Sequence, residues 1–164
     1  MKAKVRAARS EEWERARDLR LRALADAPDA FGSTLEQERE YAEPDWRAWI
    51  DGWEGSTNRF VVSETQERWV GMAVGSRTAD ERDAHVYGMW VEPAWRRRGV
   101  GASLAMAVLG WARSWGARAV LLGVTERNDG AAEFYEQLGF ADSGERHRLR
   151  EDNSLLTRIY RLEL

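Results

Sequence analysis

Cysteine is absent from the chain, and histidine occurs only twice, as His85 and His147. The lack of cysteine excludes disulfides and thiolate catalysis, and two histidines leave a zinc site short of its usual ligands. No segment approaches the roughly 20 apolar residues that a membrane-spanning helix needs, and residues 1–9 carry lysine and arginine without an apolar core. We therefore expect no metal, no membrane association and a cytoplasmic location.

An excess of charge of one sign is also missing. The chain has 25 basic and 28 acidic residues, so its formal net charge is −3. This balance argues against general attraction to nucleic acid or to an anionic membrane. With three prolines and no repeat or linker, and with 43% hydrophobic residues, residues 1–164 are expected to form a single domain with a sizeable core.

Hydrophobic periodicity and turn residues predict alternating strands and helices. The predicted strands span residues 5–8, 59–63, 69–76, 84–91, 119–124, 140–148 and 155–164. The predicted helices span residues 10–28, 33–41, 44–50, 103–115 and 128–139. Ser10, either Ser33 or Thr34, and Asn128 are the expected N-caps, and Gly116 is the expected residue after a helix end. An antiparallel meander followed by helix, strand, helix and a strand pair indicates a mixed α/β (α+β) fold.

Residues 91–102 are the most informative segment. They are predicted to form the end of a strand, a basic loop and the first turn of a helix. Gly99 and Gly101 allow the backbone to approach a ligand, and the following helix would direct unpaired N–H groups and its positive dipole end to the same place. This pattern predicts an anion site, although three consecutive arginines could also form an ordinary solvated turn or contact nucleic acid.

Two motifs carry a resemblance to a known family. The run Arg96-Arg97-Arg98-Gly99-Val100-Gly101 resembles the Gln/Arg-x-x-Gly-x-Gly/Ala signature of the GNAT superfamily of N-acetyltransferases. Residues 128–140 are similar to that superfamily's Asn-x-x-Ala-x-x-Phe-Tyr-x-x-x-Gly-Phe segment, and the element order agrees over nearly the whole chain. The resemblance implies a mostly antiparallel sheet of six to seven strands, flanked by about four helices, with a splay between strands 4 and 5.

The resemblance also implies the cosubstrate, acetyl-CoA. Backbone amides of the arginine–glycine loop would hold its pyrophosphate, the strand before the loop would pair with pantetheine, and Asn128 would contact the pantetheine or thioester end. Gly88 or Gly123 would ease the splay. The implied binding residues are Met89, Trp90, Val91, Arg96, Arg97, Arg98, Gly99, Val100, Gly101, Ala102, Asn128 and Tyr135.

The expected reaction is direct acetyl transfer to a primary amine in a ternary complex. The leaving thiolate has a basicity near 8.5, so a phenol with a pKa near 10 stays protonated at neutral pH and can donate to it. By family position Tyr135 takes this acid role, although a tyrosine on a short amphipathic helix also suits a core.

The base that deprotonates the amine is less constrained. His85 is expected to share a strand face with Tyr87, Met89 and Val91, so it is a candidate base, although partly buried histidines are more often structural. Glu92 is the nearest carboxylate to the loop but is expected on the opposite face, where it would buttress the turn. Water could replace both, and a strand N–H near Trp90 or Val91 could stabilise the thioester oxygen.

Other functions stay open. The chain could be a non-catalytic acyl-CoA sensor, an acetyltransferase of protein or peptide N-termini, or, more remotely, a nucleic-acid-binding protein. The acceptor is expected to be a small molecule, and a homodimer is possible. The tryptophans at positions 46, 49 and 53 favour packing, with an acceptor contact as the alternative. Four glutamates could attract a cationic amine or form a solvated face; they are Glu36, Glu38, Glu40 and Glu43.

Overall fold

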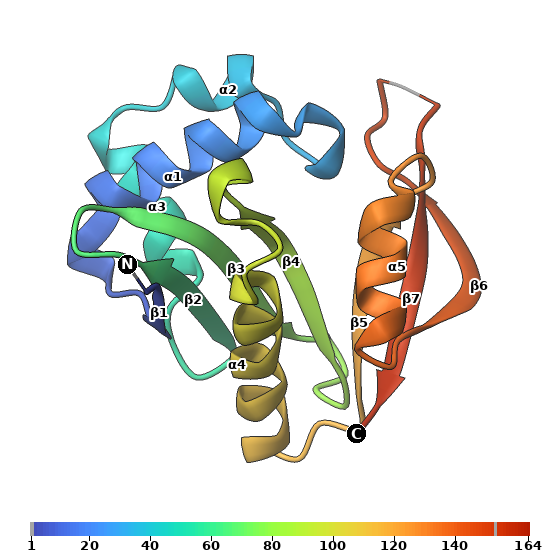
Figure 1. Ribbon diagram of the computed structural model, residues 1–164. Coiled ribbons are helices and arrows are strands. Elements are labelled where there is room, and N and C mark those ends of the chain that lie inside the picture. Colours follow the sequence, from blue (N-terminus) through green and yellow to red (C-terminus); the bar gives the residue numbers. More distant parts are fainter. Residues whose placement is uncertain (1, 153) are drawn as a thin grey trace.

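The computed structural model describes residues 2–152 and 154–164. It contains a seven-stranded sheet in the order β1-β2-β3-β4-β5-β7-β6 (Figure 1). The strands are β1 (Lys4–Ala7), β2 (Asn58–Glu64), β3 (Trp69–Arg77), β4 (Ala84–Val91), β5 (Ala119–Thr125), β6 (Ala141–Arg148) and β7 (Leu156–Glu163). All neighbours pair antiparallel except β4 and β5, which are parallel. The predicted mixed, mostly antiparallel fold is therefore confirmed.

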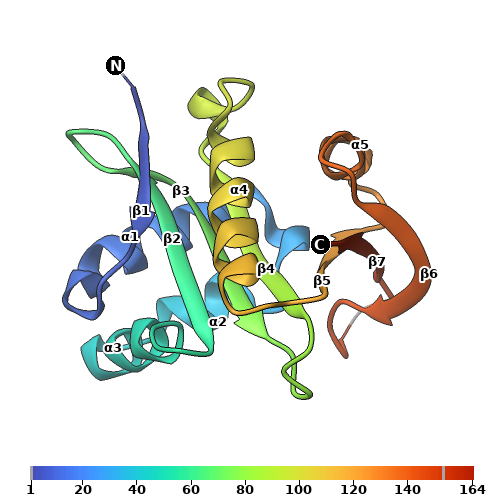
Figure 2. The same cartoon turned by 90° about the horizontal axis from the view of Figure 1, so that it is seen from below.

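Helices cover both faces of the sheet (Figure 2). They are α1 (Trp13–Asp26), α2 (Leu35–Arg39), α3 (Glu43–Gly52), α4 (Val100–Ser114) and α5 (Asp129–Gln137), with short 3-10 turns η1 (Ser10–Glu12), η2 (Pro28–Ala30) and η3 (Pro93–Trp95). One apolar core lies between the sheet and α4 with α5, and a second lies between the sheet and α1 with α3. We call these two sides the α4 face and the α1 face. No described helix is long and apolar enough to span a bilayer.

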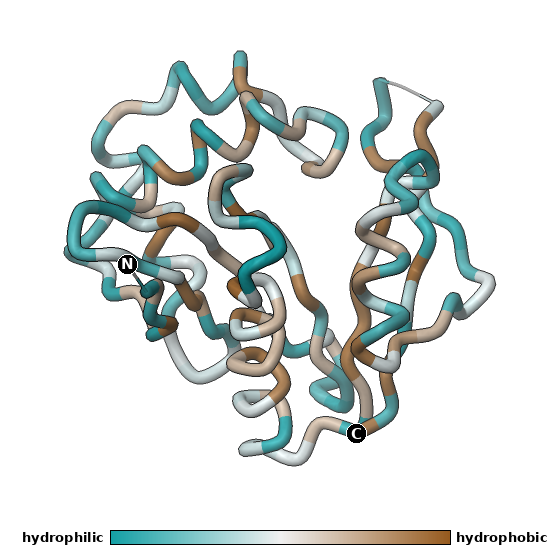
Figure 3. Tube along the Cα trace, in the orientation of Figure 1, coloured by the Kyte–Doolittle hydropathy of each residue, from teal (hydrophilic) through white to brown (hydrophobic). Residues whose placement is uncertain are grey.

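Helix α4 packs unusually close to the middle of the sheet. A Cβ at Gly75 on β3 would lie 2.7 Å from Cζ3 of Trp111 and 2.9 Å from Cγ1 of Val108. Apolar residues line this contact, and polar residues follow the outer helices and loops (Figure 3). The side chains of Trp111 and Val108 fill the space that a residue larger than glycine would need at position 75. Close packing therefore holds α4 over β3.

Caps and turn residues were predicted well, with one exception. Thr34 accepts a hydrogen bond from the Gln37 amide at 3.3 Å, Asn128 caps α5, and Gly116 has a φ of +83° after α4. Helix α2 ends at Arg39, before the predicted Tyr41. The predicted cap at Ser10 is wrong, because Ser10 lies inside η1 and its hydroxyl donates to Glu54.

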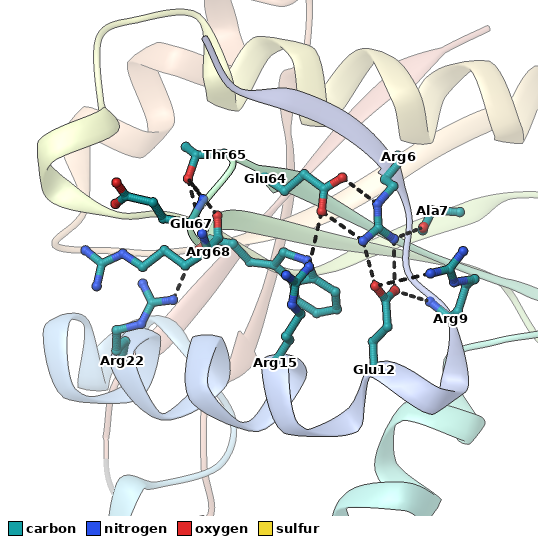
Figure 4. A network of polar contacts seen from close by, with 11 residues as sticks. Arg6, Ala7, Arg9, Glu12, Arg15, Arg22, Glu64, Thr65, Glu67 and Arg68 are labelled. Atoms are coloured by element: carbon teal, nitrogen blue, oxygen red, sulfur yellow. Dashed lines mark hydrogen bonds and ion pairs between the residues drawn. The ribbon is translucent and has the colours of Figure 1, made fainter. Parts of the chain in front are cut away.

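Charged side chains hold the start of α1 to the sheet (Figure 4). Arg6 on β1 donates from Nε to Glu64 on β2 at 2.7 Å and from Nη2 to Glu12 at 2.6 Å. These hydrogen bonds lower the pKa of both carboxyl groups. Because both carboxylates have the same arginine partner, the network orients η1, and therefore α1, on its sheet face.

The sheet opens between β4 and β5. These strands pair only from Ala84 with Val120 to Val86 with Leu122. Beyond that point β4 continues to Val91 and β5 to Thr125 without pairing to each other, and the two strands diverge (Figure 1). The splay predicted between strands 4 and 5 is therefore present, and it exposes main-chain groups on both of its edges.

A bulge in β4 lies at the opening of this splay. Between Tyr87 and Trp90, which both pair with β3, β4 has two residues where β3 has one. One of the two, Gly88, has a φ of +60°, a conformation that favours glycine. The extra residue reverses the alternation of side chains. Met89 and Val91 consequently pack on the α4 face, whereas Trp90 belongs to the core on the α1 face.

The bulge corrects one sequence prediction. His85 does not share a face with Met89 and Val91 as expected. It stacks on Tyr87, with ring centroids 4.1 Å apart, and Tyr87 contacts Trp53 beside the core of the α1 face. Glu92 was expected on the face opposite His85. The reversal instead brings it to the α1 face, where it binds Arg22 of α1.

Candidate functional site

The basic loop at the end of β4 and the first turn of α4 are here called the cradle (residues 96–102). The Arg96 amide in it donates to the Pro93 carbonyl at 3.2 Å. Arg97 and Gly99 have φ values of +59° and +80°. The first backbone hydrogen bond of α4 runs from the Ser103 amide to the Gly99 carbonyl at 3.0 Å. The amides of residues 100–102 therefore precede the helical ladder and have no intrahelical acceptor. Together with the helix dipole they favour an anion at this end of the splay.

Glycine is needed at the two positions of the motif for different physical reasons. A Cβ added at Gly99 would meet no atom within 4 Å. Glycine is therefore favoured at this position by the positive φ and not by lack of space. A Cβ at Gly101 would lie 3.2 Å from Cζ of Phe134 and 3.7 Å from Cγ2 of Val91. Gly101 therefore makes room for the α5 aromatic ring, and the expectation that it only clears space for a ligand is incomplete.

The three arginines of the cradle are not equivalent. Arg96 donates from Nε to the Val91 carbonyl at 2.8 Å and forms an ion pair with Asp26 at the end of α1. Its charge is therefore partly neutralised by a protein carboxylate. The guanidinium of Arg98 lies over the Trp95 ring at 5.3 Å. Within the described part of the chain, Arg97 and Arg98 form no ion pair, so the electrostatic attraction predicted for this loop comes mainly from them.

Across the splay, the end of β5 and the start of α5 form the other side of the opening. Thr125 Oγ1 donates to the Asp29 carbonyl of η2 at 2.6 Å, and Arg150 donates to the carbonyls of Pro28 and Phe31 at 3.1 and 2.9 Å. A pocket of about 280 Å³ lies between these segments. It is lined by Ala27, Pro28, Asp29, Ala30, Thr125, Arg127, Asn128 and Leu155. The structure thus places Asn128 both as the α5 cap and in a pocket wall.

Tyr135 lies on α5 in the core of the α4 face and is 7% exposed. Its ring contacts Phe134 and Phe140, with centroids 5.0 and 5.8 Å away. Burial raises the pKa of its hydroxyl. The hydroxyl has no partner among the described residues, and it is not one of the fully buried unpartnered atoms, so it still reaches solvent. A protonated phenol is therefore available to an adjacent group at neutral pH.

His85 is mostly buried where β4 still pairs with β5. Burial, the largest cause, lowers the pKa of its imidazole, the contact with the Val86 carbonyl raises it, and the electrostatic interaction with His147 lowers it. Nδ1 lies 3.1 Å from the Val86 carbonyl oxygen. Because a carbonyl only accepts, Nδ1 carries the proton and Nε2 has the basic lone pair. His85 is therefore neutral at pH 7 and can accept a proton. His147, for which the sequence indicated no partner, lies within electrostatic range of it.

Glu92 is held by cations. One carboxylate oxygen accepts from Arg22 Nη1 at 3.2 Å and from Arg68 Nη2, and the Glu92 amide donates to the Val70 carbonyl at 2.8 Å. These contacts tie the end of β4 to α1 and to the turn before β3. They fit the buttressing role weighed for Glu92, and its ion pairs oppose a role as a base.

A buried ion pair on the α1 face has no counterpart in the sequence prediction. Arg20 of α1 donates from Nε to Glu38 Oε2 at 3.0 Å and from Nη2 to Oε1 at 2.8 Å. The two residues are 9% and 2% exposed. Glu38 is thus neither solvated nor free to attract an amine, unlike the exposed Glu36 and Glu40. Only the clustering of acidic residues drew attention to this helix, and no signal identified the arginine.

Trp46 and Trp49 are part of the packing on the α1 face, as expected. A larger pocket of about 580 Å³ lies on the outer side of α1, α2 and α3, with Arg17, Leu21 and Arg39 among its lining residues. None of the predicted catalytic or cofactor-binding residues lines it, but Trp46, for which an acceptor contact was the alternative to packing, does. Among the residues that the structure describes, no group of three histidine or acidic side chains is placed to hold a metal ion.

Known proteins resemble this chain in sequence and in fold. Residues 13–140 match the acetyltransferase (GNAT) family. The chain is 34% identical over 128 residues to a mycothiol acetyltransferase of Thermobispora bispora, covering 74% of this chain and 40% of that protein. It is 30% identical over 109 residues to an uncharacterized N-acetyltransferase of Methanocaldococcus jannaschii, covering 62% and 48%. The chain therefore spans about half the length, or less, of these relatives.

The structure of yncA from Salmonella typhimurium with its cofactor acetyl-CoA has the same fold, with a TM-score of 0.79 at 17% identity. The match covers 100% of this chain and 95% of that one.

Proposed function

Because the chain belongs to the acetyltransferase (GNAT) family, we propose that it transfers an acetyl group from acetyl-CoA directly to a primary amine of a small molecule. The observation that carries the proposal is the run of unpaired amides in the cradle, placed at the end of a splayed pair of strands. The T. bispora relative is named for the small molecule mycothiol, which supports a small-molecule acceptor.

The cradle fits the diphosphate of coenzyme A. Residues 97–102 combine left-handed backbone at Arg97 and Gly99 with the first amides of a 15-residue helix. Charge-assisted hydrogen bonds to such amides contribute about 1.5–3 kcal/mol each, so a few of them suffice to hold a diphosphate. Arg97 and Arg98, which have no carboxylate partner in the described chain, add attraction at longer range.

The splay fits the extended arm of the cofactor. Beyond Val86, β4 has no strand partner on its β5 side, so the main chain of Met89, Trp90 and Val91 can pair with the amides of pantetheine as an added strand would. An N–H on this edge can donate to the thioester oxygen during attack. Asn128, which lines the pocket between η2 and the end of β5, is assigned the contact with the arm from the opposite side of the splay.

Tyr135 and His85 supply the two proton transfers. Bound acetyl-CoA supplies an activated acyl group and a thiolate leaving group with a basicity near 8.5. Tyr135, whose pKa is raised by burial, donates a hydrogen bond or a proton to that sulfur. An alkylamine with a pKa near 10.4 is about 0.1% neutral at physiological pH, so His85 Nε2 accepts the proton of the ammonium, directly or through water. We assign Glu92 to positioning of the β4 end.

A panel of primary amines tests this function. Purified protein is mixed with acetyl-CoA and each amine, and release of the free coenzyme A thiol is followed. At least one small amine should support release above the rate of acetyl-CoA hydrolysis, and double-reciprocal plots should intersect, as a ternary complex requires. Binding of acetyl-CoA without turnover of any amine would identify a sensor. Turnover only of peptides would replace the small-molecule acceptor with a protein one.

A further inference from the structure

The buried Arg20–Glu38 pair leaves part of the arginine unused. Glu38 accepts from Nε and Nη2 of Arg20, so the third nitrogen, Nη1, has no partner among residues 2–152 and 154–164. The fully buried unpartnered polar atoms lie elsewhere, for example Ser63 Oγ and Trp69 Nε1. Arg20 Nη1 therefore keeps contact with solvent, although the residue is only 9% exposed.

This nitrogen lies beside the β4 bulge, where the splay opens. Arg20 Nη1 is 3.8 Å from the position that a Cβ on Gly88 would take. Gly88 is in the β4 bulge, just beyond the last pair of β4 with β5, where the splay opens. Arg20 comes from α1, so its free N–H groups reach this point from the side opposite the cradle helix. An acceptor that approaches the splay across the α1 face would meet them.

The guanidinium is also fixed in orientation. Its carbon lies 4.6 Å from the centre of the Phe31 ring and 5.7 Å from that of Trp49. Two ring contacts and two nitrogens bound to Glu38 leave little rotational freedom, so the free N–H groups are preorganised. Burying an ion pair rarely adds stability compared with an apolar pair of the same size. A fixed N–H donor beside the reaction site would instead give the Arg20–Glu38 pair a role in recognising the acceptor.

We propose that Arg20 Nη1 donates to a carbonyl oxygen next to the acceptor's amino group, which makes the acceptor class an aminoacyl amide. The inference deepens the proposed function and rests on it. Glu38 already balances the charge of Arg20, so a neutral carbonyl is a better match than a carboxylate, which Glu38 would repel. Tyr87, 46% exposed on the same face, can contact an apolar side chain of the acceptor.

Two amines that differ in one group test the proposal. Phenylalaninamide and phenethylamine have the same ring and a primary amine, but only the first has a carbonyl beside it. Because the α-amino group of phenylalaninamide has a lower pKa than an alkylamine, kcat/KM is calculated on the concentration of the neutral amine. On that basis the wild-type value should be about 10- to 100-fold higher for phenylalaninamide, the size of one charge-assisted hydrogen bond. In R20M/E38Q, which removes both charges together and avoids a lone buried ion, this ratio should fall to about one. Arg17→Met, an exposed change on the same helix, should leave the ratio unchanged.

The outcomes separate the two proposals. A wild-type ratio near one, or a ratio that R20M/E38Q leaves unchanged, overturns the role of Arg20 while amine acetylation stands. If no amine is acetylated, the proposed function fails, and calorimetric titration of phenylalaninamide into the protein with coenzyme A decides the remaining question. Binding that R20M/E38Q abolishes supports Arg20 as the donor, and absence of binding to the wild type overturns it. A peptide with N-terminal phenylalanine that shows the same dependence on Arg20 supports the carbonyl contact and points to a larger acceptor.

Discussion

The cradle and the α1 face are made from different parts of the chain. On the cradle side, main-chain amides of one continuous segment, residues 96–102, converge at a helix end. On the α1 face, side chains from segments far apart in sequence meet, as in the Arg20–Glu38 pair and the contact of Arg150 with Phe31. Main-chain recognition depends on backbone conformation and leaves a local motif in the sequence. Side-chain recognition depends on packing and leaves none.

The largest effect is expected at Tyr135, the proposed acid on α5. Tyr135→Phe removes the hydroxyl and keeps the ring that packs on Phe134 and Phe140. Loss of a positioned acid lowers kcat by about 10²- to 10⁴-fold, whereas the Kd for acetyl-CoA should change far less. Steady-state kinetics and calorimetry measure both. An unchanged kcat would remove Tyr135 from the mechanism.

Breaking the α1 face should destabilise the fold without altering the cradle. Glu38→Ala leaves the buried guanidinium of Arg20 unpaired, which costs about 3–5 kcal/mol. For a chain of this size the Tm should fall by roughly 10 °C, and acetyl-CoA affinity below that temperature should be retained. Glu36→Ala, an exposed change on the same helix, is the control and should shift Tm by little. Equal Tm losses for the two variants would contradict a structural role for the pair.

The reverse experiment breaks the cradle. Gly99→Val places a β-branched residue at a φ of +80°, a strain of roughly 1–3 kcal/mol. If the loop relaxes to relieve it, acetyl-CoA binding should weaken about tenfold or more, while Tm changes little. The control is Gly110→Val inside α4, the helix that Gly99 precedes; an added Cβ there also meets open space, and the change should not affect acetyl-CoA binding. Calorimetry on both variants makes the comparison, and similar Kd values would count against the cradle.

The smallest effect concerns a pH profile. Because burial lowers the pKa of His85 below its usual 6.5, the neutral base form predominates at pH 7 and is lost only in more acidic solution. In the wild type, kcat/KM should therefore fall through an inflection below pH 6.5, and His85→Gln should lack this inflection. A profile that keeps the same acidic inflection in His85→Gln would assign it to another group.

The same contrast explains what could be predicted from the sequence. The order of elements along the chain, the splay, the cap at Asn128 and a cap at Ser33 or Thr34 follow from local residue patterns or from the family resemblance. The reversal of faces in β4 was missed because one inserted residue hardly changes the apolar pattern of a strand, although Gly88 inside that strand was a possible signal.

The ion pair on the α1 face could not have been predicted in this way. Arg20 and Glu38 are 18 residues apart on separate helices, and each has the pattern of an ordinary solvated charge. Only the packing of α1, α2 and the Phe31 segment brings them together. Ser10 shows the same limit on a smaller scale, because its hydroxyl bonds to Glu54, 44 residues away, in preference to capping the helix next to it.

The central claim is that main-chain amides of the cradle bind the diphosphate of coenzyme A, and amide NMR tests it most directly. In a titration of ¹⁵N-labelled protein with coenzyme A, the backbone amide signals of residues 97–102 should show the largest downfield proton shifts, as expected for N–H groups that gain a charged acceptor. If those signals stay in place while shifts concentrate elsewhere, for example around the outer pocket of α1, the account is contradicted.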